Sequence, residues 1–316
     1  MSQSQDWFQQ LPQNIVIGLQ QGSVYSLIAL GYTLVYGVLQ LINFAHSEVF
    51  MAGGFGSYLV VNGIVGKRHL SGVMVPVTVL AGILSGALCG AGIAWLLEKV
   101  AYRTLRRSGA PKLAFLISAI GASLFLSNLA GKLFNRLQNN QFPAYFNINH
   151  QVFKIGSAKI SLIDLIIVVT AVLMMVFLDR LVNRTKLGRS IRAVAEDAPT
   201  AALMGVDIDK TISRTFVIGG ALAGVAGFMY GTAFTVFNLM GFTPGVKAFA
   251  AAVLGGIGNI RGAMIGGLIL GQAEVLIAAL PFVGAQWNDV ISFVVLVLIL
   301  LVRPTGILGE RLARAA

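Results

Sequence analysis

The chain is a succession of long apolar runs separated by short basic segments. A helix needs about 20 mostly apolar residues to span a bilayer, because each backbone polar group in hydrocarbon must be paired within the structure. Hydrophobic residues make up 56% of the 316 residues and charged residues 11%, against about 25% in soluble domains. The sequence predicts an all-α, polytopic transmembrane helical bundle of about eight to ten crossings, forming a single domain over residues 1–316. The candidate runs cover residues 14–39, 42–64, 74–97, 113–133, 160–178, 215–237, 262–283 and 290–302.

Lysines and arginines between the runs predict which ends of the helices are cytoplasmic. Residues 99–112 hold five, residues 180–214 hold seven, and the tail from Arg303 holds three. Because cytoplasmic loops are enriched in these residues, these segments are expected inside, and segments 66–73 and 132–159 outside. Topology thus explains the net charge of +11, which would suggest nucleic acid binding in a soluble protein. No nucleic acid partner is expected, and the side of the N-terminus stays open.

Residues 245–258 form a shorter apolar piece, about half as long as a span. Three full runs lie between Arg214 and Arg303, whereas an even number of crossings is needed to return to the same side. The short piece is therefore expected to complete a crossing as part of a broken helix, ending near Arg261. Glycines interrupt apolar segments here, at Gly255 and Gly256, and again at residues 53–56; in transporters such breaks indicate binding sites, and the alternative is a packing kink.

Glycines spaced four apart recur in the apolar runs. This spacing places two glycines on one face of a helix, where another backbone can approach closely. Packing within the chain is the main expectation, and a second subunit is the alternative. The glycines concerned are Gly18 with Gly22, Gly82 with Gly86 and Gly90, Gly220 with Gly224, Gly262 with Gly266, and Gly267 with Gly271.

Ionisable residues at membrane depth are candidates for function, because they are costly there unless paired or hydrated. His46 and Glu48 begin the second run, where the alternative is an interfacial cap or a polar turn. Glu274 lies near the middle of the run 262–283, where it lines a polar pathway or bonds to a broken helix. Three charged residues near the ends of runs are attributed instead to snorkelling or capping: Asp164, Lys247 and Asp289.

The segment 180–214 carries four acidic residues among its basic ones and is expected to be ordered. Apolar residues at helical spacing are followed by Pro199, which favours a helix start, and Gly205, which favours a stop. This pattern predicts a two-turn helix at 199–204, with Asp197 complementing its N-terminal dipole. Such a helix suits the groove of a cytoplasmic partner, and the alternative is a helix resting on the membrane surface.

Enzymatic signatures are missing from the sequence. There is no P-loop, so the chain is not expected to bind ATP in that way, and no catalytic constellation is recognisable. Cys89 is the single cysteine, and neither a cysteine-based metal cluster nor another metal site is expected. We expect no cofactor and no enzymatic activity of the chain itself.

Several short motifs follow one another along nearly the whole chain. They are GYTLVYG at 31–37, INFAHSE at 42–48, EKVAYR at 98–103, AED at 195–197, LMGV at 203–206, AAVLGGIG at 251–258 and RPTGILG at 303–309. Each motif is modest, but their order and spacing are specific, and together they resemble the branched-chain amino acid ABC transporter permeases of the LivH type. Ser47 departs from a position that is commonly Gly in that family, and Thr104 from one that is commonly Pro.

The resemblance implies an ABC importer permease fold in the bacterial cytoplasmic (inner) membrane. It also implies four kinds of neighbour: a second, related permease, two cytoplasmic ABC ATPase subunits, a periplasmic amino acid-binding protein and the lipid bilayer. The helix ending at Gly205 would then sit in an ATPase groove. The residues assigned to that contact are Arg192, Glu196, Asp197, Ala201, Ala202, Leu203 and Gly205, and those assigned to the translocation pathway are Asn43, His46, Glu48, Gly255, Gly256 and Glu274.

Other functions stay open at this point. A urea or short-chain amide permease would have a similar sequence, since the binding protein largely selects the substrate. A stand-alone secondary transporter or channel would use His46, Glu48 or Glu274 to relay protons or ions. An intramembrane enzyme is disfavoured by the lack of a catalytic constellation, and a homodimer of permeases remains an alternative to a heterodimer.

Overall fold

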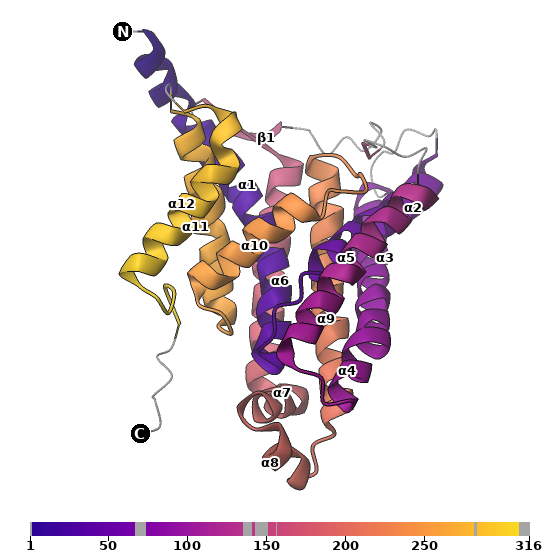
Figure 1. The fold of residues 1–316 in the computed structure, drawn as a ribbon. Coiled ribbons are helices and arrows are strands. Elements are labelled where there is room, and N and C mark those ends of the chain that lie inside the picture. Colours follow the sequence, from indigo (N-terminus) through magenta and orange to yellow (C-terminus); the bar gives the residue numbers. More distant parts are fainter. Residues whose placement is uncertain are drawn as a thin grey trace. The chain divides into compact units, whose positions relative to one another are not determined.

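The computed structural model describes residues 2–66, 74–134, 141–142, 151–155, 157–280 and 283–309, and almost all of its regular structure is helical (Figure 1). The elements are α1 (Ser2–Leu39), α2 (His46–Val65), α3 (Met74–Leu97), the π-helical turn η1 (Glu98–Tyr102), α4 (Arg103–Arg107), α5 (Lys112–Leu133), β1 (Gln151–Ile155), β2 (Ala158–Ser161), α6 (Leu162–Arg184), α7 (Lys186–Glu196), α8 (Ala198–Leu203), α9 (Ile208–Ala233), α10 (Phe242–Gly255), α11 (Ile260–Ala278), the 3₁₀ turn Ala285–Trp287 and α12 (Asn288–Val302).

Seven helical segments in the described part of the chain are long and apolar enough to cross a membrane, and α10 and α12 are shorter apolar helices. The predicted all-α, polytopic bundle is therefore confirmed. One addition is a small antiparallel hairpin, β1–β2, in which Lys154 pairs with Lys159. It lies in the long segment that the sequence predicts to be external.

The chain forms two compact units. The first unit consists of Met1–Thr33, Ile148–Met175 and Lys247–Ala316, and the second of Leu34–Asn147 and Val176–Val246. Boundaries between the two units fall inside three helices, α1, α6 and α10.

Glycine contacts hold the core of the second unit together. A Cβ atom on Gly224 of α9 would lie 1.9 Å from the carbonyl oxygen of Gly86 on α3. A Cβ on Gly53 of α2 would lie 2.2 Å from the Cα of Gly224, so α2, α3 and α9 meet around this glycine. Backbones approach so closely only where side chains are absent. The glycines in this part of the chain therefore pack within the chain, as expected.

Similar contacts organise the first unit, where α1 crosses α11. A Cβ on Gly271 would lie 2.3 Å from the Cα of Gly22. At the other end of α11, a Cβ on Gly255 would lie 2.0 Å from the carbonyl oxygen of Gly262, so the close turn between α10 and α11 needs glycine.

The residues after α12 return to the end of α10. The amide of Ile307 donates to the carbonyl of Leu254 at 2.8 Å, and the amide of Leu308 donates to that of Gly255 at 3.0 Å. The end of α10 and the C-terminal tail therefore lie at the same end of the first unit. The crossing by the short apolar piece stays a prediction.

Candidate functional site

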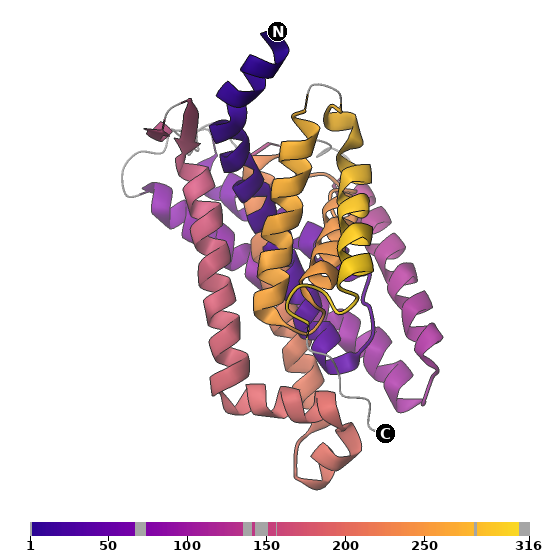
Figure 2. The same cartoon turned by 90° about the vertical axis from the view of Figure 1, so that its left-hand side faces the viewer.

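The segment between α6 and α9 has a well-defined local structure. Thr185 caps α7 by accepting a hydrogen bond from the amide of Gly188 at 3.0 Å. A Cβ on Gly188 would lie 2.0 Å from the carbonyl oxygen of Val182, so glycine allows α7 to turn tightly off the end of α6. Figure 2 shows α7 turned across the end of α6. Ile191 and Val194 follow the predicted helical spacing and are buried residues of α7.

Helix α8 begins and ends where the sequence predicts, within one residue. The side chain of Asp197 accepts hydrogen bonds from the hydroxyl and the amide of Thr200, and these bonds lower the pKa of Asp197 below its ordinary value. Pro199 occupies the first turn. Gly205 adopts a φ of +83°, and its amide donates to the carbonyl of Ala202 at 3.0 Å, so the helix stops there.

The residues assigned to the coupling contact differ in how exposed they are. Leu203 is 88% exposed, the most exposed large hydrophobic side chain in the described part of the chain, and its neighbour Met204 is 81% exposed. Glu196, Asp197, Ala202 and Gly205 are also exposed, whereas Ala201 is buried. Arg192 donates to the carbonyl of Val182 and to Asn183 Oδ1, so its guanidinium fastens α7 to the end of α6.

Three of the residues assigned to the pathway gather in the second unit, at the turn that leads into α2. Asn43, His46 and Glu48 are each less than 5% exposed; Asn43 precedes α2, and His46 and Glu48 lie in its first turn. The hydroxyl of Tyr102 donates to Asn43 Oδ1 at 2.8 Å, and the hydroxyl of Ser123 donates to Glu48 Oε1 at 3.1 Å.

Glu274 forms the centre of a buried polar cluster in the first unit. Its side chain is 1% exposed and pairs with the ammonium group of Lys247 at 2.6 Å. The hydroxyl of Tyr25 donates to it at 3.0 Å, that of Ser292 at 3.2 Å, and the amide of Gln21 at 3.2 Å. Four donors from α1, α10 and α12 therefore converge on one carboxylate of α11.

The attribution of Lys247 to snorkelling is wrong. Its side chain is 6% exposed and bridges Glu274 and Asp289, the latter at 2.8 Å. The capping explanation is confirmed for Asp164, whose carboxylate accepts from the amide of Ser161 at 2.9 Å before α6. Gly255 and Gly256 form the close turn after α10, where a Cβ on Gly256 would lie 2.5 Å from the amide nitrogen of Gly309.

Sequence reasoning missed Lys247, Tyr25, Gln21 and Ser292 as partners of Glu274. A usable signal was that Lys247 and Glu274 are opposite lone charges on two apolar segments, and buried charges need partners. Glu98 was also missed; it is fully buried. Within the described residues, no group of three or more His, Cys, Asp or Glu side chains could hold a metal ion.

Comparisons with known proteins cover nearly the whole chain. The family model for "Branched-chain amino acid transport system / permease component" matches residues 14–300. The "High-affinity branched-chain amino acid transport system permease protein LivH" of Escherichia coli K12 is 42% identical over 303 residues, which is 94% of this chain and 95% of that protein. The corresponding protein BraD of Pseudomonas aeruginosa is 43% identical over 302 residues, with the same coverage. A "Probable branched-chain amino acid transport permease protein LivH" of Methanocaldococcus jannaschii is 28% identical over 305 residues, which is 92% of this chain and 91% of that protein.

Proposed function

The chain belongs to the family of branched-chain amino acid transport permease components, and we propose that it forms half of the translocation pathway of an ATP-driven importer for branched-chain and other neutral hydrophobic amino acids. It is a multi-pass protein of the inner membrane and a transport subunit, not an enzyme. Its proposed partners are a second, related permease in a heterodimer, two cytoplasmic ABC ATPase subunits and a periplasmic amino acid-binding protein.

The observation that supports ATPase coupling is the exposure of α8. Leu203 and Met204 extend from a capped helix in the longest segment predicted to be cytoplasmic. Large apolar side chains exposed together commonly form protein contacts, and a short helix with such side chains fits a hydrophobic groove. Asp197 and Gly205 hold the two ends of this helix, so they would present it in a defined shape.

The connections of α8 suggest how the contact would act. α7 precedes it and is fastened to α6 through Arg192, and α9 follows it and packs against α2 and α3. Movement of α8 by closing ATPases would therefore pull on helices of the second unit. We assign the transient polar lining of the pathway to Asn43, His46, Glu48, Gly255, Gly256 and Glu274, and most of the substrate selectivity to the binding protein.

The test combines purification with transport. The tagged chain is isolated from its native membranes in detergent, and co-purifying proteins are identified by mass spectrometry. We expect a second permease and two ATPases, and labelled leucine uptake that requires ATP and the binding protein. Purification of the chain alone with gradient-driven uptake would instead support a secondary transporter. Uptake of urea but not leucine would indicate the amide permease.

Variants of α8 then test the coupling contact. Changing both Leu203 and Met204 to Asp should abolish ATPase co-purification and uptake, while the amount of protein in the membrane stays the same. Ser108→Asp is the matched control, because Ser108 is also exposed and belongs to the other basic segment predicted to be cytoplasmic. Normal uptake in the double variant would contradict the coupling role.

A further inference from the structure

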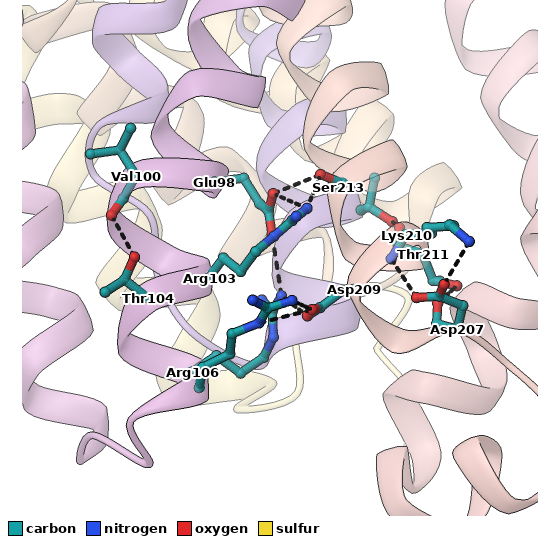
Figure 3. A network of polar contacts seen from close by, with 12 residues as sticks. Glu98, Val100, Arg103, Thr104, Arg106, Asp207, Asp209, Lys210, Thr211 and Ser213 are labelled. Carbon is teal, nitrogen blue, oxygen red and sulfur yellow. Dashed lines mark hydrogen bonds and ion pairs between the residues drawn. The ribbon is translucent and has the colours of Figure 1, made fainter.

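A polar network outside the residues already assigned lies at the junction of η1, α4 and α9 in the second unit (Figure 3). Its centre is Glu98, whose side chain is 0% exposed at the end of the apolar helix α3. Glu98 accepts hydrogen bonds from Arg103 Nη2 at 3.0 Å, Arg106 Nη2 at 3.2 Å and Ser213 Oγ at 2.6 Å. A carboxylate so deeply buried is tolerated only with such partners.

Arg106 extends the network to α9. The same guanidinium nitrogen that binds Glu98 also pairs with Asp209, so one arginine bridges two carboxylates on different helices. Arg103 adds a second link, since its Nη2 atom donates to Ser213 at 2.9 Å. Figure 3 shows both arginines reaching from the η1–α4 segment towards α9.

Arg103 and Arg106 are more buried than basic residues need to be if their only role is to set the orientation of the helices in the membrane. Cytoplasmic lysines and arginines set orientation by their number, and that role does not require them to be buried or paired. The side chains of Arg103 and Arg106 are only 26% and 20% exposed; Arg103 pairs with Glu98, and Arg106 pairs with both Glu98 and Asp209. The sequence-based interpretation of these arginines as purely topological is therefore incomplete.

The network lies directly beside the end of the coupling segment. Asp207 caps α9 by accepting from the amide of Lys210 at 3.0 Å, and Asp209 lies in the first turn of this helix. Only Gly205 and Val206 separate the C-cap of α8 from the cap of α9. Because the connection between α8 and α9 is so short, a displacement of α8 would also move the start of α9 and the ion pairs of Asp209.

The other end of the network reaches the turn before α2. Glu98 and Tyr102 are the first and last residues of η1, and both are buried. The Tyr102 ring packs between Phe115 and Phe216, and its hydroxyl donates to Asn43 Oδ1 at 2.8 Å. π-helical turns occur frequently at functional sites, and here the π-helical turn connects α9 to Asn43, which lies just before α2.

We infer that Glu98, Arg103, Arg106, Asp209 and Tyr102 are positioning residues that carry the movement of α8 to the start of α2. This inference rests on the proposed function, because it requires an ATPase to move α8. The ion pairs make the start of α9 and the η1 turn one rigid body, and the Tyr102 hydroxyl passes the displacement of that body to Asn43. Coupling between distant sites travels through such packed and hydrogen-bonded elements.

The test measures ATP hydrolysis and leucine uptake together, in proteoliposomes that contain the complete transporter. Tyr102→Phe removes the hydroxyl that donates to Asn43 and keeps the aromatic ring, and Asp209→Asn removes the negative charge that pairs with Arg106. We expect both variants to assemble and to hydrolyse ATP at nearly the wild-type rate, but to move several-fold less leucine per ATP. Asp209→Glu, which keeps the carboxylate, should recover most of the wild-type ratio.

Lys112→Gln is the control, because Lys112 is an exposed basic residue of the same segment; its ratio of leucine to ATP should be unchanged. A purely structural network would lower thermal stability, hydrolysis and uptake in parallel, and an unchanged ratio in Tyr102→Phe and Asp209→Asn would overturn the inference. Leucine uptake by the wild-type protein without ATP would overturn the proposed function itself. An unchanged ratio of leucine to ATP in the two variants of an ATP-dependent transporter would overturn only the inference about the network.

Discussion

At the scale of single residues, Lys247 and Glu274 form a buried ion pair within the first unit. Removing one partner of a buried pair leaves an uncompensated charge, which typically costs about 3–5 kcal/mol. We expect Lys247→Met to lower the thermal midpoint of the protein in detergent markedly. The double variant Lys247→Met with Glu274→Gln should recover part of the loss, because no charge is left without a partner.

Asp289→Asn is the appropriate comparison for this pair. The Asp289 side chain also contacts Lys247 but is 65% exposed, and exposed ion pairs contribute about 0–1 kcal/mol. Fluorescence-detected size-exclusion chromatography after heating would measure the thermal midpoints of Lys247→Met, of the double variant and of Asp289→Asn. A Lys247→Met protein as stable as the wild type would show that the pair contributes nothing to stability.

A second residue-scale prediction concerns the cap of α8. Hydrogen bonds to Thr200 lower the pKa of Asp197 in the folded protein, so the cap is fully present above the ordinary Asp value of about 3.9 and is lost as the pH falls through the lower, folded value. Hydrogen exchange of residues 198–206, corrected for intrinsic rates, should therefore be equal at about pH 5 and about pH 7.

Removing the capping side chain should speed hydrogen exchange of residues 198–206, although acidification from about pH 7 to about pH 5 should not. Asp197→Ala should speed exchange in the same segment, whereas Asp197→Asn should not, since Asn also caps helices well. Equal protection in the Ala variant would mean that other contacts hold the helix.

At the scale of elements, the packing of α3 against α9 depends on glycines that have no room for a methyl group. Overpacking usually costs about 1–3 kcal/mol, and at Gly224 the new atom would meet the backbone oxygen of Gly86, which cannot rotate away. We expect Gly224→Ala to reduce the folded yield and the thermal midpoint. Gly92→Ala on α3 is the control, because a Cβ there has no atom within 4 Å; equal losses in both variants would argue against the packing explanation.

At the scale of the whole molecule, the basic segments predict which side of the membrane is cytoplasmic. Arg107 of the first segment pairs with Asp209 of the second at 2.8 Å, so residues 99–112 and 180–214 lie on the same side. In a Cys89→Ala background, single cysteines at Ser108 and Met204 should react with a membrane-impermeant maleimide only from the cytoplasmic side. A cysteine at Ser157, beside the hairpin, should react only from outside. Labelling of Met204→Cys from outside would reverse the topology.

The amino-acid sequence by itself determined the class of the fold and the boundaries of α8, and it predicts the orientation of the loops. These features depend on local chemistry: apolar length sets the spans, charge predicts the sides, and α8 is bounded by Asp197, Pro199 and Gly205 in sequence. The expected completion of a crossing by the piece before Gly255 followed from parity alone. The sequence also singled out Glu274 and the polar residues at the start of α2 as candidates for function, because ionisable groups inside apolar runs are easily recognised.

Only the tertiary structure decided which of these groups meet. Lys247 and Glu274 are 27 residues apart on separate helices, and Arg106 and Asp209 are 103 apart. Whether two such side chains touch depends on how the helices rotate and cross, and in this chain glycine contacts set those crossings. A charge near the end of a span can snorkel to the surface or turn inward to a partner, and composition is the same in both cases. The physical difference lies in the burial that the neighbouring helices impose.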